Sequence, residues 1–227
     1  MKSHLKRLFT PKSWTLLKKE QKFIVRPKPG THPAKLSMPI TLLLKKLGYA
    51  ATTQEVKKIL STKEVLVDGR RVKEHKFPVG FMDVVTIKDT NDVFRILLDE
   101  KGRLKIIPVD KEEALLKLCR IKKKTALKNR KIQLNLSDNR NILVDKDACK
   151  VGDSVLITVP FQEIRQHLPL EKGALIYLIG GKHSGHKGTV DAIEKNKLVY
   201  TSARKKYESL VKYAFVVGKG KESIKLS

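Results

Sequence analysis

The sequence predicts a mainly β protein of the α+β class, built from several small domains. Three observations support this class. The clearest helical periodicity is confined to residues 39–60, where apolar residues recur every three or four positions. Elsewhere the apolar residues form short β-prone runs separated by glycine, aspartate and asparagine turns. Apolar residues make up 41% of the 227 residues, enough to bury several cores, whereas a disordered chain would be more polar.

Residues 1–37 are predicted to form a basic extension. Glu20 is its one acidic residue, against ten lysines and arginines. Three prolines and a glycine exclude regular structure from Arg26 to Ala34. Such an arm repels itself in free solution and folds against a polyanion. Trp14 either stacks on a base or packs on the next domain, and we favour packing because burial is the commoner fate of an aromatic side chain.

Residues 38–90 form the clearest predicted module, which begins with two short helices. Pro39 suits the first turn of a helix, and Gly48 can end it. Thr52 and Glu55 match a capping box for the second helix. Periodicity places apolar residues on the buried stripe of each helix and lysines on the opposite face. These lysines are Lys45, Lys46, Lys57 and Lys58.

A hairpin is predicted after the two helices, because Asp68-Gly69 lies between two β-prone runs. The turn presents Arg70 and Arg71 at its exit, and residues 84–87 are expected to add a strand. Helix and hairpin cations should therefore lie within reach of one surface. An ordinary solvated face is the alternative, but we favour RNA contact because the module carries many bases and few compensating acids. The cations are Lys57, Lys58, Arg70, Arg71 and Lys73.

Residues 91–170 are predicted to form a central β domain. A short helix is expected over residues 112–118. Eight cations and no acid occur between Lys117 and Lys131, a run that is either a solvated face or part of the same anion-binding excess. The strands are expected at residues 94–98, 104–109, 132–136, 142–144 and 154–159.

Residues 171–227 are predicted to form a small antiparallel barrel. Two apolar runs flank a glycine-rich loop at residues 180–188. Glycines let such a loop adopt positive φ and let its backbone come close to a partner. Lys182, His183 and Lys187 are then expected to face that partner.

Net charge is the strongest functional signal in the sequence. Forty-nine lysines and arginines against 23 acidic residues give +26. Such an excess attracts phosphate backbones and makes affinity fall steadily with salt. A soluble basic protein with solvated lysines is the alternative. It is disfavoured because this charge causes self-repulsion unless an anionic partner offsets it.

Other features bear on the compartment of the protein. Cys119 and Cys149 stand alone without metal-type spacing, which fits a reducing compartment. The basic N-terminus lacks the apolar stretch of a signal peptide. The apolar runs are too short to span a bilayer. We therefore expect a cytoplasmic protein with no membrane partner.

Motifs for catalysis are incomplete. A P-loop needs lysine directly after its second glycine, but His186 follows Gly185. His183 and His186 have no nearby third ligand for a metal. No Gly-x-Ser-x-Gly elbow occurs. We therefore expect no catalytic residue, no metal, no cofactor and no small-molecule substrate.

Two regions resemble known nucleic-acid-binding modules. Residues 38–88 resemble the RNA-binding module first recognised in bacterial ribosomal protein four, which pseudouridine synthases and some tRNA synthetases share. The matching residues are Leu43-Leu44, Leu47-Gly48, Glu55-Val56 and Val65-Leu66-Val67-Asp68-Gly69. Residues 173–199 resemble a KOW motif, the loop of SH3-like barrels in ribosomal proteins and transcription elongation factors. Its structural glycines are Gly181, Gly185 and Gly188.

Over its full length the chain resembles the small-subunit ribosomal protein four family of eukaryotes and archaea, the e-type. This resemblance implies a structural constituent of the small ribosomal subunit that binds small-subunit rRNA, supports assembly and translation, and is not an enzyme. It also implies neighbouring small-subunit ribosomal proteins as partners. The N-terminal signature matches at His4, Lys6, Arg7, Leu8, Pro11 and Trp14. Further matches are Gly80-Phe81-Met82-Asp83-Val84, Phe94-Arg95, Lys101-Gly102-Arg103, Leu118-Cys119 and Phe215-Val216-Val217-Gly218.

Two alternatives stay open beside this family: an RNA-modifying enzyme that docks through the module, and a KOW-type transcription elongation factor. Pseudouridine synthases carry a catalytic aspartate in Gly-Arg-Leu-Asp, but Lys105 ends the similar string here. The usual Arg-Leu-Asp opening of the module is replaced by residues 38–40, so no arginine contact is expected there. Phe9 also departs from the family, which usually has a small or polar residue at that position.

The residues expected to contact rRNA are cationic or histidine side chains from all four parts of the chain. They are His4, Lys6, Arg7, Lys12, Arg26, Lys28, Lys45, Lys46, Lys57, Lys58, Arg70, Arg71, Lys73, Lys122, Lys123, Lys124, Lys182, His183 and Lys187. We refer to these residues as the predicted contact set.

Overall fold

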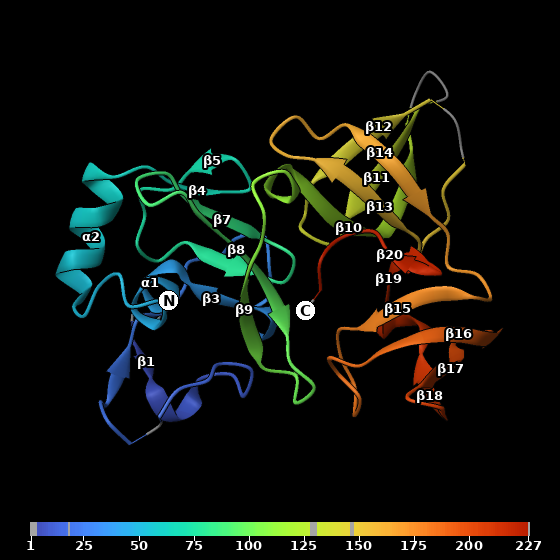
Figure 1. Cartoon of the computed structure of the whole chain (residues 1–227), viewed down its shortest axis with the longest axis horizontal. Helices are drawn as coiled ribbons and strands as arrows, with labels where there is room; N and C mark the ends of the chain where they lie inside the picture. The colour runs from blue at the N-terminus through green and yellow to red at the C-terminus, as the bar shows by residue number, and fades with distance from the viewer. Residues whose placement is uncertain (1–3, 18, 128–130, 146–147, 227) are drawn as a thin grey trace. The chain divides into compact units, whose positions relative to one another are not determined.

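The computed structural model describes residues 4–17, 19–127, 131–145 and 148–226, which form two compact units (Figure 1). Strands make up most of the regular structure, and the two α-helices of the described residues lie in the first unit. The predicted mainly β, α+β class is therefore confirmed. The first unit contains the described residues up to Leu97 together with Arg103–Ala114, and the second contains Leu98–Gly102 together with those from Leu115 onward.

The arm folds onto the first unit through short elements. Strand β1 (Leu5–Lys6) pairs with β2 (Phe23–Ile24) in antiparallel register, and a 3₁₀-helix spans Arg7–Phe9. The side chain of Trp14 is only 4% exposed, and its indole nitrogen donates a hydrogen bond of 2.7 Å to the Ser37 carbonyl. The expectation that Trp14 is packed is confirmed. Two predicted arm cations, Lys2 and Lys18, lie outside the described residues.

The predicted helix pair is also confirmed. Helix α1 spans Ile40–Lys46 and helix α2 spans Thr53–Thr62. The Thr52 hydroxyl accepts a hydrogen bond from the Glu55 backbone at 3.2 Å, and the Glu55 carboxylate accepts one from the Thr52 backbone at 3.4 Å. This reciprocal capping satisfies backbone donors that the first turn of a helix leaves without partners.

Two sheets complete the first unit. The Asp68-Gly69 hairpin is confirmed, since both turn residues have positive φ, as a two-residue turn of this type requires. A two-stranded sheet pairs β3 (Ser37–Pro39) with β6 (Pro78–Gly80). A five-stranded sheet has the order β5 (Arg70–Arg71), β4 (Val65–Val67), β7 (Val84–Ile87), β8 (Asp92–Leu98) and β9 (Leu104–Pro108). Strands β8 and β9, expected to open the central β domain, therefore extend the sheet of the helical module.

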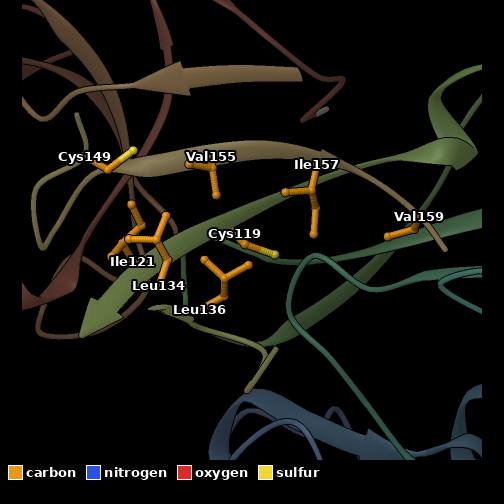
Figure 2. Close-up of a cluster of buried hydrophobic side chains, with 8 residues drawn as sticks. All are labelled: Cys119, Ile121, Leu134, Leu136, Cys149, Val155, Ile157 and Val159. Atoms are coloured by element: carbon orange, nitrogen blue, oxygen red, sulfur yellow. The ribbon is translucent and has the colours of Figure 1, made fainter. Parts of the chain in front are cut away.

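The second unit contains a five-stranded antiparallel sheet with its own core. Figure 2 shows a cluster of eight buried apolar side chains that forms this core: Cys119, Ile121, Leu134, Leu136, Cys149, Val155, Ile157 and Val159. The strand order is β12 (Asn141–Val144), β11 (Ile132–Leu136), β10 (Leu116–Ala126), β13 (Ser154–Thr158) and β14 (Ile164–Leu168).

The helix expected over residues 112–118 is wrong. Only a 3₁₀-turn forms at Glu113–Leu115, and β10 begins at Leu116. Pairing of Leu116 with Thr158 and of Leu118 with Leu156 in β13 overrides the local helix preference, because tertiary context outweighs weak propensity. Two cations of the predicted run, Lys128 and Arg130, lie outside the described residues.

The predicted C-terminal barrel appears as a six-stranded antiparallel sheet, coloured orange to red in Figure 1. The glycine-rich loop joins β15 to β16, as expected. The strand order is β18 (Lys205–Leu210), β17 (Lys197–Ser202), β16 (Lys187–Glu194), β15 (Ala174–Leu178), β19 (Ala214–Lys219) and β20 (Lys221–Glu222).

Candidate nucleic-acid interface

Helix α2 turns a basic face to solvent. Val56 and Leu60 are buried against the unit, which leaves Lys57 and Lys58 exposed. The Arg71 guanidinium donates a hydrogen bond of 3.3 Å to the carbonyl of Ser61 in the last turn of α2. The structure thus brings the hairpin and the helix together, as the sequence pattern indicated.

The two hairpin arginines are not equivalent. Arg70 pairs across the hairpin with Val67, and Arg71 pairs with Leu66. Successive side chains of a strand point to opposite faces of the sheet. Arg70 and Arg71 are both exposed, but only Arg71 is tied to α2. The two guanidinium groups therefore extend from opposite faces of the hairpin.

Some cations of the first unit serve its own folding. Arg7 is buried, and its guanidinium lies 2.8 Å from the Glu20 carboxylate. The Lys46 ammonium donates hydrogen bonds to the Thr15 hydroxyl at 2.7 Å and to the Leu104 carbonyl at 3.3 Å. These contacts tie the arm to α1 and β9. The sequence did not indicate this internal use of Arg7 and Lys46.

The remaining arm cations of the predicted contact set lie nearer the surface. His4, Lys6 and Lys12 are exposed, and Arg26 is half-buried. The ammonium of Lys28 forms an ion pair with the Glu74 carboxylate. Since both side chains of that pair are substantially exposed, solvent screens it and its net contribution is small. An incoming phosphate can therefore compete for Lys28.

The cation run of the central sheet divides into an internal and an external part. Lys117 is buried, with its ammonium 3.2 Å from the Asp138 carboxylate. The Arg120 guanidinium donates to the carbonyl of Val211, at 3.1 Å. Beyond a register shift in β10, Lys122 and Lys123 are exposed. The long strand therefore presents only its C-terminal half as a basic surface.

Lys124, the third lysine of this external part, is half-buried. Its ammonium donates a hydrogen bond of 2.6 Å to the Cys149 carbonyl. This contact fixes the side chain against the core while its neighbours extend into solvent.

The backbone of the glycine-rich loop packs closely against other backbone segments of the same chain. A Cβ atom placed on Gly185 would lie 1.8 Å from the carbonyl oxygen of Asp99. One on Gly188 would lie 2.6 Å from the carbonyl oxygen of Thr201. These two glycines therefore permit close packing within the chain, whereas the sequence pattern had suggested a close approach of the loop backbone to a partner. Gly181 has positive φ, as expected.

The charged side chains of this loop differ in exposure. Lys182 is exposed, whereas the Lys187 ammonium is paired with the Glu222 carboxylate at 2.8 Å. The His183 ring packs against Tyr207, with ring centroids 4.9 Å apart, and against His186, at 5.1 Å. Burial lowers the pKa of His183 below its ordinary value, and the neighbouring His186 and Lys182 act in the same direction. His183 is therefore neutral at pH 7 and offers a ring rather than a charge.

We expect His183 to titrate with a midpoint below pH 6.5 in an NMR chemical-shift titration. Replacing Lys182 with glutamine should raise that midpoint, because it removes a positive charge that opposes protonation. A midpoint above 6.5 in the unaltered protein would contradict the lowered pKa of this ring.

Tyr200 and Tyr207 are members of this ring cluster that sequence reasoning missed. Their rings stack across β17 and β18 with centroids 5.6 Å apart. The connecting turn is Ala203-Arg204, and both residues have positive φ. Such φ values are uncommon outside glycine, asparagine and aspartate, so the residue types did not signal this hairpin. The equal spacing of the two tyrosines about the turn was the one available clue.

The described residues give little support for metal binding, membrane insertion or catalysis. No three of its His, Cys, Asp and Glu side chains are grouped so as to hold a metal ion. None of its helices is long and apolar enough to cross a membrane. Lys105, which stands where a pseudouridine synthase has its aspartate, is an exposed residue of β9.

Exposed lysines and arginines lie on α2, on the β4–β5 hairpin, on β10 and on the glycine-rich loop. This distribution is typical of a basic protein that binds a polyanion. Comparison with known families identifies it more narrowly. Residues 1–35 match the model of the RS4NT (NUC023) domain, and residues 38–85 match that of the S4 domain. Residues 90–164 match the model of the ribosomal family S4e.

Full-length relatives agree with these matches. The small ribosomal subunit protein eS4 of Methanocaldococcus jannaschii is 43% identical, over 99% of this chain and 98% of that protein. The eS4 of Methanothermobacter thermautotrophicus is also 43% identical, over 99% of this chain and 96% of that protein. The crystal structure of the 30S ribosomal protein S4e from Thermoplasma acidophilum superposes with a TM-score of 0.70 at 28% identity, covering 81% of this chain and 96% of that one. The chain belongs to the eS4 family of small ribosomal subunit proteins, which confirms the resemblance seen in the sequence.

Proposed function

We propose that this protein is a structural constituent of the small ribosomal subunit that binds small-subunit rRNA and supports subunit assembly and translation. Membership of the eS4 family supports this role. The observation that carries the RNA contact is the basic surface formed where Arg71 of the hairpin meets α2, with Arg70 exposed on the opposite face of the hairpin. Phosphate contacts from lysine and arginine supply most of the affinity, while the shape of the folded RNA supplies placement.

The proposed contacts come from those members of the predicted contact set that reach the surface. In this arrangement Arg7, Lys46 and Lys124 hold the fold together behind the interface, and their exposed neighbours meet phosphates. Neighbouring small-subunit ribosomal proteins are the other proposed partners, and the cytoplasmic ribosome is the proposed location. We further propose four functional parts, with boundaries at residues 1–37, 38–90, 91–170 and 171–227, and an SH3-like KOW role for the last.

Replacing both Arg70 and Arg71 with glutamine is expected to weaken binding to small-subunit rRNA and to flatten its salt dependence. Each lost phosphate contact should reduce the slope of log affinity against log salt by about 0.7–0.9. Filter binding or fluorescence anisotropy across a salt series measures both quantities. Because the two side chains point to opposite faces, the single variants should differ from each other.

A matched control removes the same charge from the same unit. Lys63 and Lys88 are exposed, but their ammonium groups already lie 3.3 Å from Asp89 and 2.9 Å from Glu64. The double glutamine variant at these two positions should change the salt slope much less. An equal change in both double variants would show that net charge alone matters, and would remove the hairpin from the interface.

We propose no catalytic role. Incubating the purified protein with rRNA and assaying for pseudouridine addresses the main enzymatic alternative. Sustained turnover would replace the structural role with an enzymatic one. Co-sedimentation with polymerase in place of small subunits, after a high-salt wash, would instead favour a transcription factor.

A further inference from the structure

One cleft in the first unit has an unusual lining. Its volume is about 450 Å³, and its walls include two aromatic side chains, Phe9 and Trp14, together with three prolines. Two cations, Arg26 and Lys28, also line it, and none of its lining residues is acidic. Glu20, by contrast, lines both of the other clefts described in this unit. This cleft therefore combines apolar, aromatic walls with positive charge.

The two aromatic walls are held differently. Trp14 is nearly buried and is fixed by the hydrogen bond from its indole nitrogen to Ser37, which also lines the cleft. Phe9 projects from the 3₁₀-helix Arg7–Phe9 and is 75% exposed. A large apolar ring so exposed at the edge of a cleft is typical of a binding surface. The Trp14 ring is therefore held in place by packing and a hydrogen bond, whereas the Phe9 ring is open to solvent.

We propose that this cleft binds one unpaired nucleobase of RNA, stacked on Phe9, with the flanking phosphates near Arg26 and Lys28. This inference rests on the proposed rRNA-binding function and adds a base-stacking site to it. A flat aromatic base matches an exposed ring and apolar walls, and such stacking accepts any base because every base has a π-face. The sugar-phosphate chain that must accompany the base matches the two cations.

Charge favours RNA over a protein side chain as the occupant. An apolar side chain from a neighbouring protein would use the prolines and rings but would bring no charge for the cations. The arm that forms most of the cleft has ten cations and one acid in residues 1–37. Lys28 is paired with Glu74 across solvent, and Glu74 does not line the cleft. That exposed pair is weak enough for a phosphate to replace.

The chain contains its own reporter, since Trp14 is its only tryptophan. The experiment uses the full chain at low salt with two probes of equal length, an oligouridine and the same ribose-phosphate chain without bases. Trp14 fluorescence reports occupation of the cleft, and anisotropy of end-labelled RNA reports total binding. We expect oligouridine to change Trp14 emission and the abasic chain to bind without doing so.

The Phe9→Ser variant tests whether the exposed Phe9 ring binds the base. It should weaken oligouridine binding roughly 5- to 100-fold and suppress the Trp14 response, while leaving affinity for the abasic chain unchanged. Phe9→Tyr keeps a ring and should restore both. Leu8→Ser is the matched control, because Leu8 lies in the same 3₁₀-helix, is 65% exposed and lines none of the three clefts described in this unit. It should change neither measurement.

The outcomes separate this site from the wider function. If oligouridine and the abasic chain bind equally, and Phe9→Ser matches Leu8→Ser, the base site is overturned while RNA binding stands. If neither probe nor structured rRNA binds, both proposals are overturned. If an apolar peptide saturates the Trp14 response and RNA does not, the cleft belongs to a protein partner. The Trp14 emission maximum of each free variant confirms that the arm remains folded.

Discussion

Asp138→Ala is expected to lower the free energy of unfolding of the second unit by about 3–5 kcal/mol. The Asp138 side chain is 1% exposed and lies 3.2 Å from the Lys117 ammonium and 3.0 Å from the Arg140 guanidinium. Removing it takes away the Asp138 carboxylate that lies beside Lys117, which is equally buried. A buried charge that loses its counter-ion destabilises far more than a surface ion pair does.

The ionisation of Asp138 gives this effect a pH signature. Burial alone would raise the pKa of Asp138, but Lys117 and Arg140 outweigh burial and hold the pKa below its ordinary value of 3.8. A lowered carboxylate pKa stabilises the fold above the pKa of the unfolded chain, and that contribution is lost as pH falls through the folded value. The difference between Asp138→Ala and the parent should therefore shrink at acidic pH.

Urea denaturation followed by circular dichroism, with hydrogen exchange in β10 and β11, measures this loss within the correct unit. Glu222→Gln is the control, because its pair with Lys187 is about one-third exposed on each side and should contribute roughly 0–1 kcal/mol. Combining Lys117→Met with Asp138→Leu should recover most of the stability, because apolar replacement of a buried pair is often neutral. A loss below 1 kcal/mol for Asp138→Ala would contradict the assigned role.

The Lys117–Asp138 pair illustrates which parts of the fold a single sequence can predict and which it cannot. The helix pair and the Asp68-Gly69 hairpin were predictable, because caps, periodicity and turn residues are local signals. Strand β10 was not, since its first half is stabilised by pairing with β13 and by a carboxylate some twenty residues away. Lys117 appeared as one more cation in a basic run, although the fold buries it. Local patterns do not report such long-range partners.

The candidate interface shows the same division. Lys57, Lys58 and Lys73 are exposed, as helical and strand periodicity indicated. Arg7 depends on Glu20, and Lys46 on Thr15, which is 31 positions away. A cation that the fold buries or ties to the rest of the chain is less available to RNA, and a single sequence does not show which cations are held in this way. The cleft lined by Phe9 and Trp14 is a further case, since its walls come from separate parts of the arm.

Gly185→Ala is the second change expected to have a large effect. Gly185 has a φ of +89°, in the left-handed region that side chains disfavour by about 1–2 kcal/mol. An added Cβ would also lie 1.8 Å from the Asp99 carbonyl oxygen and 2.5 Å from its carbon, both backbone atoms that cannot rotate away. Overpacking of this kind typically adds about 1–3 kcal/mol. Together the two effects should reach about 2–5 kcal/mol.

Gly173 separates the two causes. It has a similar φ of +82°, but nothing lies within 4 Å of the position its Cβ would take. Gly173→Ala should therefore show only the backbone strain, about 1–2 kcal/mol. Denaturation of both variants, with hydrogen exchange over residues 180–188, compares them directly. Equal losses would show that the approach of the loop to Asp99 is unimportant.

The loop variant also links packing to RNA binding. The Gly185 backbone donates a hydrogen bond of 2.7 Å to the Leu178 carbonyl. Gly185 also packs against the Asp99 backbone, so two contacts hold the loop at this residue. If Gly185→Ala pushes the loop away from Asp99, Lys182 and the His183 ring move with it. Small-subunit rRNA affinity should then fall for Gly185→Ala and remain close to the parent value for Gly173→Ala. Such a result would mean that an internal glycine contact, rather than contact of the glycine with RNA, places the cationic side chain of this loop.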